Sequence, residues 1–168
     1  SQVDGDANVG FRKPGLTVGG YVRYPLKERL MLRPEIRLEQ LGSRSKTDLI
    51  VGVGYASIPL LLEYQFPLFF GETERNITLL GGPVIGILAY GRDITGDRSA
   101  DLSRFDSRIT LGMGLQISDR WATNFRLGYS VFSFIGANSA LAQSFTQGVR
   151  GGAFHRYLSL ELHYQLSD

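Results

Sequence analysis

The chain has 168 residues, of which 20% are charged, and its formal net charge is only +2. This length suits one domain or one small barrel, and the near balance of charge gives no reason to expect a nucleic-acid partner. The absence of cysteine excludes a disulfide scaffold, a thiolate zinc site and a cysteine nucleophile. No apolar run approaches the ~18 residues of a transmembrane helix.

Taken in chain order, segments with a period of two recur, whereas a sustained 3.6-residue periodicity is absent. We predict long strands at 15–25, 30–42, 54–66, 77–91, 105–118, 121–134 and 153–166. They exceed the ~5–6 residues typical of strands in globular proteins. They also reach the ~9–11 residues with which a tilted strand crosses a bilayer.

The connections between these strands alternate in length. The residues 26–29 and 119–120 are short turns, and 67–76 is an intermediate connection on the same side. The connections on the other side are long and cover roughly 43–53, 92–104 and 135–152. Short turns at one end and long polar loops at the other are typical of outer-membrane barrels, although soluble barrels and sandwiches can share the pattern.

The stretch 30–42, LMLRPEIRLEQLG, carries a charge at every second position from residue 33 to residue 39. These four charges therefore share one face of the predicted strand, and the apolar residues share the other. Five other predicted strands separate polar from apolar residues in the same way, and only 77–91 is ambiguous, with glycine on both faces. The ionisable residues assigned to the polar face are Arg23, Arg33, Arg37, Arg108, Arg126, Glu35, Glu39, Glu63, Asp106 and Glu161.

This polar face is rich in glycine and arginine and carries no lysine. On a water-exposed face we expect few glycines, because glycine weakens strands. Inside a narrow barrel glycine makes room for long side chains, and arginine pairs with carboxylates in a bidentate manner. Opposite charges must be matched where they are enclosed, because an unpaired buried charge is very costly. We therefore predict a charge network in a closed lumen and lipid against the apolar face. The alternative is a soluble protein whose apolar face forms the core.

These features predict an all-β fold, an up-and-down antiparallel transmembrane β-barrel of about eight strands, with seven long strands visible. Residues 1–168 would form a single domain that crosses the bacterial outer membrane several times. Aromatic residues near the strand ends, among them Tyr21, Tyr55 and Tyr157, predict two girdles at the membrane interfaces. Side chains just fill a barrel of this size, so we expect no solute channel.

Three segments carry a family resemblance. The motif LRPE lies at 32–35, IPLLLEYQF at 58–66 and GPVIG at 82–86. With the preceding strand and short turn, they resemble the PorT-like outer-membrane β-barrel domain of Bacteroidota. The resemblance implies a small outer-membrane barrel, and some members of that family serve protein secretion or gliding machinery. The chain departs from such barrels at its last strand, which ends in YQLSD instead of an aromatic residue.

Catalytic residues are sparse. Both histidines of the chain, His155 and His163, fall on the polar face of the last predicted strand, together with Ser159 and Glu161. A lipid hydrolase would need a serine, a histidine and an acid in contact. Ser159 and His155 are four residues apart on a strand, which separates them by roughly 13 Å. We therefore predict no enzymatic activity, no metal site and no cofactor.

By elimination, the sequence favours a structural or accessory subunit of an outer-membrane complex for protein assembly, secretion or transport. Its expected partners are outer-membrane lipid and other outer-membrane or periplasmic proteins, and not nucleic acid. In the loop 135–152, Leu141 and Phe145 lie among serine, glutamine and alanine and are expected to contact a partner. The alternatives are a membrane-embedded lipid hydrolase and a loop-based ligand binder or adhesin.

The number of strands raises a separate expectation. Single-chain bacterial barrels have an even number of strands, whereas seven are visible here. If 26–29 is a periplasmic turn, the strand 15–25 runs inward from the cell surface, and an outward-running strand should precede it. We expect this native first strand to lie before Ser1. The alternatives are an eighth strand around 142–146 and partial pairing by residues 1–12.

Overall fold

Residues that alternate between apolar and polar, with glycine spread among them, favour extended chain over helix. The computed structural model describes residues 2–4, 15–44, 50–70, 73–93, 96–97, 104–131 and 154–166. Its strands are β1 (Gln2–Asp4), β2 (Thr17–Tyr21), β3 (Tyr24–Lys27), β4 (Leu30–Arg44), β5 (Ile50–Phe70), β6 (Thr73–Asp93), β7 (Gly96–Asp97), β8 (Phe105–Gln116), β9 (Trp121–Ser130) and β10 (Phe154–Tyr164).

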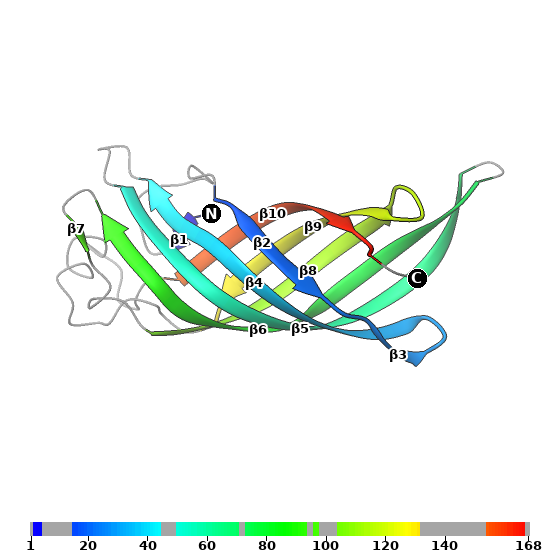
Figure 1. Cartoon of the computed structure of the whole chain (residues 1–168), viewed down its shortest axis with the longest axis horizontal. Coiled ribbons are helices and arrows are strands. Elements are labelled where there is room, and N and C mark those ends of the chain that lie inside the picture. The colour runs from blue at the N-terminus through cyan, green and yellow to red at the C-terminus, as the bar shows by residue number, and fades with distance from the viewer. Residues whose placement is uncertain are drawn as a thin grey trace.

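The strands form one strongly curled antiparallel sheet (Figure 1). The order of hydrogen-bonded neighbours is β1-β10-β9-β8-β6-β5-β4-β2, while β3 also pairs with β4 and β7 with β6. Short turns at 28–29 and 117–120 join β3 to β4 and β8 to β9, as expected where consecutive strands form hairpins. The predicted all-β, antiparallel fold of about eight strands is confirmed, and each of the seven long strands is present.

The predicted strand 15–25 is divided between β2 and β3. Both parts pair with β4, and the amide of Val22 between them donates a hydrogen bond to the carbonyl of Pro34 at 3.2 Å. A further hydrogen bond, from the amide of Gln40 to the carbonyl of Leu16 at 2.8 Å, continues the pairing to the residue before β2. The segment therefore acts as one edge strand that follows β4 along most of its length.

β5 and β6 are longer than predicted, with 21 residues each. The expected loop 43–53 and the expected connection 67–76 are largely strand. We call the end of the sheet that carries the turns 28–29 and 117–120 the turn end, and the opposite end, where β4 ends and β5 begins, the loop end. At the turn end, β4 pairs with β5 as far as Tyr64, and β8 pairs with β6 from Ile77 onward. Beyond these points, 67–70 and 73–76 pair with each other and form a two-stranded ribbon that projects past the neighbouring strands (Figure 1).

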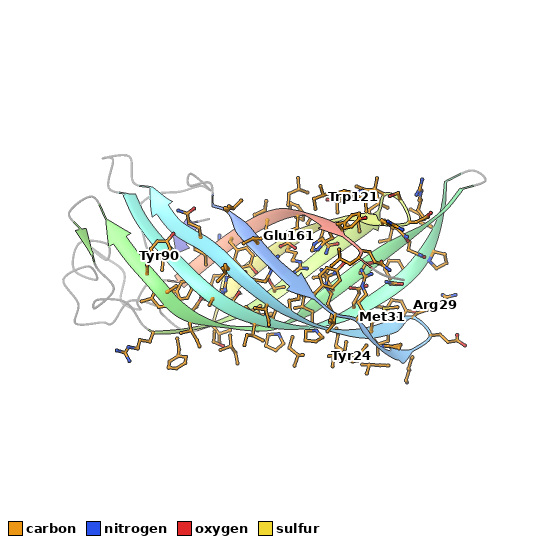
Figure 2. All side chains as sticks on the ribbon, in the orientation of Figure 1. Tyr24, Arg29, Met31, Tyr90, Trp121 and Glu161 are labelled. Carbon is orange, nitrogen blue, oxygen red and sulfur yellow. The ribbon has the colours of Figure 1, made fainter. Side chains whose placement is uncertain are left out.

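Burial alternates along the strands as the sequence pattern predicts. The four alternating charges of β4 from Arg33 to Glu39 are enclosed, with Arg33 at 1% exposure, whereas Ile36 on the other face is 71% exposed. Figure 2 shows side chains on both faces of the curled sheet. The ambiguous segment 77–91 is resolved, because Leu80 and Val84 point inward while Ile85 is exposed.

Three aromatic residues do not lie where the sequence predicted. Tyr55 and Tyr157 are buried inside the sheet, and the ring of Tyr21 lies against the inward-facing Arg33, with 3.7 Å between the guanidinium carbon and the ring centroid. The prediction that these three belong to the girdles is wrong, because strand parity and not nearness to a strand end decides the face. Exposed aromatic residues near the strand ends include Tyr24, Tyr64, Tyr90, Phe105, Trp121 and Tyr164.

Candidate functional site

The alternating charges of β4 pair along the strand. Residues two apart on a strand share a face, so each carboxylate of β4 lies beside a guanidinium. Glu35 forms ion pairs with Arg33 Nε at 2.7 Å and with Arg37 Nε at 3.3 Å. Arg37 Nη1 also lies 3.4 Å from Glu39. One strand therefore carries four buried charges whose formal sum is zero.

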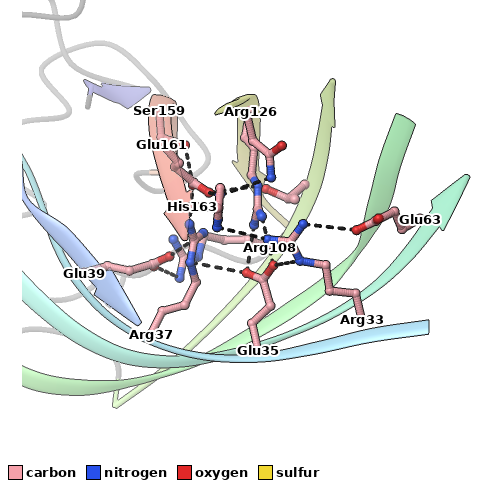
Figure 3. A network of polar contacts seen from close by, with 12 residues as sticks. Arg33, Glu35, Arg37, Glu39, Glu63, Arg108, Arg126, Ser159, Glu161 and His163 are labelled. Atoms are coloured by element: carbon pink, nitrogen blue, oxygen red, sulfur yellow. Dashed lines mark hydrogen bonds and ion pairs between the residues drawn. The ribbon is translucent and has the colours of Figure 1, made fainter. Parts of the chain in front are cut away.

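Other strands reach this row from across the interior (Figure 3). Arg126 on β9 donates two hydrogen bonds of 2.8 Å to the two oxygens of Glu35, a bidentate pair between strands that are not neighbours. Its Nε lies 3.1 Å from Glu161 on β10, which also pairs with Arg37. Charge-assisted bidentate pairs of this kind are among the stronger polar contacts in proteins.

The remaining predicted charges join the same network at its two ends. Glu63 on β5 pairs with Arg33 at 3.1 Å and with Arg23 at 3.0 Å. Arg108 on β8 pairs with Glu39 and, through its Nε, with Asp106 at 2.9 Å. The structure thus brings all ten residues assigned to the lumen into one set of ion pairs. Nine of their side chains are at most 8% exposed, and Arg23, at the turn end, is 27% exposed.

Uncharged polar groups support the network. The hydroxyl of Ser130 donates to Asp106 at 2.8 Å, and the amide of Gln65 donates to Glu63 at 2.8 Å. Tyr157 and Thr110 share a hydrogen bond through their hydroxyl groups. Sequence reasoning did not assign Tyr157 to the interior, although its cross-strand partner Gly128 was a usable signal. The Tyr157 ring fills the space that a Cβ at that glycine would need.

The arrangement fills the interior with matched charge. The ion pairs run from β4 across to β8, β9 and β10, where a solute would have to pass. Side chains fill the interior of an eight-stranded barrel even without such pairs. An opening of about 360 Å³ at the turn end is lined by residues including Asn124, His163 and Arg23, and Arg23 belongs to this network. The geometry suits a structural plug.

The possible catalytic residues of β10 do not form a relay. Ser159 Oγ donates to Glu161 Oε1 at 2.9 Å, and Glu161 Oε2 lies 3.1 Å from His163 Nε2. The serine therefore bonds to the acid, whereas a catalytic serine must be able to pass its proton to the histidine. The side chain of His155 lies outside the described residues. Within the described part of the chain, no three His, Asp or Glu side chains form a cluster suited to a metal ion.

Leu141 and Phe145, the predicted partner-contact residues, also lie outside the described residues. No segment in the described ranges is a helix with the length and hydropathy needed to cross a membrane.

The outer surface carries an apolar belt. On β8 and the residue after it, the exposed side chains from Phe105 to Ile117 are apolar at all positions of the outward row except Ser107. Twelve steps of ~3.3 Å give a row ~40 Å long, or ~30 Å along the membrane normal at a strand tilt of ~40°. Barrels that span an outer membrane carry an apolar band ~25 Å tall.

A curled antiparallel sheet with a charged interior and an apolar belt defines a membrane-spanning β-barrel. Residues 4–136 match the family described as outer membrane protein beta-barrel domain, and the chain belongs to that family. It is therefore an outer-membrane β-barrel protein in contact with membrane lipid. No curated protein and no solved structure matches the chain.

Proposed function

We propose that this barrel is a non-catalytic structural or accessory subunit of an outer-membrane complex for protein assembly, secretion or transport, and that it is a PorT-like member of its family. The observation that carries the proposal is the occupied interior. Because paired arginines and carboxylates fill the lumen, this protein does not conduct solutes. It acts instead through contacts made by its outer surfaces.

Two ends of the barrel offer such surfaces. Between β9 and β10, the sequence of the segment 135–152 carries Leu141 and Phe145 among polar residues, and we propose that these two side chains contact a protein partner. At the turn end, the ribbon of residues 67–70 and 73–76 extends past the neighbouring strands, and Leu68 on it is 36% exposed. A projecting ribbon supports contact with a periplasmic protein, since it reaches beyond the lipid-facing belt.

The two alternative functions receive less support. A lipid hydrolase needs a serine that bonds to a histidine, whereas Ser159 bonds to Glu161. A loop-based ligand binder or adhesin would use the loop end, as the subunit would, but would not require a stoichiometric membrane partner.

Isolation from native membranes in a mild detergent tests the proposal. A tagged wild-type protein should retain at least one stoichiometric outer-membrane or periplasmic protein. The double variant Leu141→Ser/Phe145→Ser should lose that protein or retain less of it. The matched control Gln143→Ser/Gln147→Ser changes the same loop without removing apolar side chains and should behave as wild type. A barrel that migrates alone from native membranes would contradict the subunit role.

A further inference from the structure

The two edges of the curled sheet run in the same direction. β2 and β10 both pass from the loop end to the turn end, and their arrowheads point the same way in Figure 1. The hydrogen-bonded neighbours from β4 to β10 are all antiparallel to each other. β2 and β10 therefore cannot continue the antiparallel pattern by pairing with each other. An antiparallel ring requires one strand of opposite direction between them.

The seam between these edges is open from residue 157 to the turn end. An opening of about 620 Å³ is lined by residues 19–23 on one side and 162–166 on the other. A second opening, of about 430 Å³, continues toward the loop end between residues 15–21 and 157–163. In the described ranges β2 and β10 do not pair with each other. Side-chain contacts that cross the seam from within include the ring of Tyr21 against that of His163, with centroids 5.3 Å apart, and the ion pair of Arg37 with Glu161.

One end of the seam already holds a strand of the required direction. β1 pairs antiparallel with the first residues of β10, in a register that places Gln2 opposite Arg156 and Asp4 opposite Phe154. β1 therefore runs from the turn end toward the loop end. Continued backward from Gln2, this register would carry the chain along the unpaired edge of β10, past Leu158, Leu160 and Leu162.

We propose that β1 is the end of a full-length strand, formed by the residues directly upstream of Ser1 in the protein, and that this strand fills the seam and closes the barrel. The register assigns its side chains. The second, fourth and sixth residues upstream of Ser1 lie opposite Ser159, Glu161 and His163 and face the lumen. The first, third and fifth lie opposite the three exposed leucines of β10 and face lipid.

The network restricts the chemistry of this strand. The ten lumen charges already sum to zero and are paired, so an additional inward charge would be enclosed without a partner. The inward positions should therefore hold small or uncharged polar residues, and the outward positions apolar ones. This inference concerns the closure of the barrel and does not depend on the proposed function.

The coding sequence upstream of Ser1 gives the first test and requires no folded protein. The expected result is seven or more residues in which apolar residues alternate with small or uncharged polar ones in the stated phase. A start codon or a secretion-signal cleavage site directly at Ser1, or charges at the outward positions, would overturn the proposal.

Disulfide cross-linking in the protein that carries this upstream segment gives the second test. With Leu162→Cys as the common position, a cysteine at the fifth residue upstream of Ser1 should cross-link in high yield. The control pair Gly20→Cys/Leu162→Cys should not, because an intervening strand holds the two Cα atoms beyond the ~7 Å that a disulfide permits. Cross-linking of the Gly20 pair instead, or covalent dimers through Leu162→Cys alone, would show that β2 or a second copy occupies the seam.

Discussion

Removal of Arg126 should reveal how strongly the lumen network stabilises the barrel. The side chain is fully buried, and it makes two 2.8 Å bonds to Glu35 and a 3.1 Å ion pair with Glu161. Arg126→Met keeps an unbranched side chain but leaves four cations of the network against five carboxylates. Breaking a buried pair costs ~3–5 kcal/mol. Because Glu35 retains Arg33 and Arg37, we expect the lower end of that range, about 3 kcal/mol.

Reversible urea unfolding in lipid vesicles measures this free energy, followed by the fluorescence of Trp121, the single tryptophan. Arg29→Ala in the exposed β3–β4 turn is the control and should change the unfolding free energy by less than about 0.5 kcal/mol. The double variant Arg126→Met/Glu35→Leu should lose less than the sum of the single variants, since it removes both members of the pair. The reasoning is refuted if Arg126→Met is no less stable than Arg29→Ala.

Three further predictions follow from the two faces of the sheet. Ile36→Arg and Leu111→Arg place a charge in the lipid-facing belt and should each lower stability in vesicles by ~2–4 kcal/mol, measured by urea unfolding; normal insertion of both would invert the assignment of faces. Gly128→Ala puts a Cβ where the Tyr157 ring lies and should cost ~1–3 kcal/mol. Gly20→Ala, with nothing within 4 Å of its Cβ, should cost less. In planar bilayers the wild-type protein should show no steady conductance, and stable channel openings would disprove a filled lumen.

The strands and their faces could be predicted because the sequence repeats one physical signal. In a strand of period two, a charge at Arg33 and another at Arg37 must share a face, and the apolar residues between them must share the opposite one. The same parity also shows why Tyr21 and Tyr157 were misassigned to the girdles. Each lies near a strand end, but its odd position places it with the inward row.

The extent of β5 and β6 and the pairing inside the lumen could not be predicted. The predicted strand 54–66 stops before Pro67, a residue that cannot donate to a ladder, whereas β5 continues through this proline to Phe70. Equal numbers of arginines and carboxylates predict that pairs form, but not which ones. Arg126 meets Glu35 because the curled sheet brings β9 opposite β4, and this depends on curvature and strand order, which a one-strand pattern does not encode.

The row of charges on β4 also has a consequence for insertion. Arg33, Glu35, Arg37 and Glu39 are joined by contacts within one strand, so they neutralise each other before any distant strand arrives. Asp106 and Arg108 do the same on β8. A nascent hairpin that enters the bilayer therefore presents close ion pairs instead of isolated charges, which lowers the electrostatic cost of the crossing. A slip of β4 by one residue would turn all four charges toward lipid, so the row also selects the correct register while the barrel assembles.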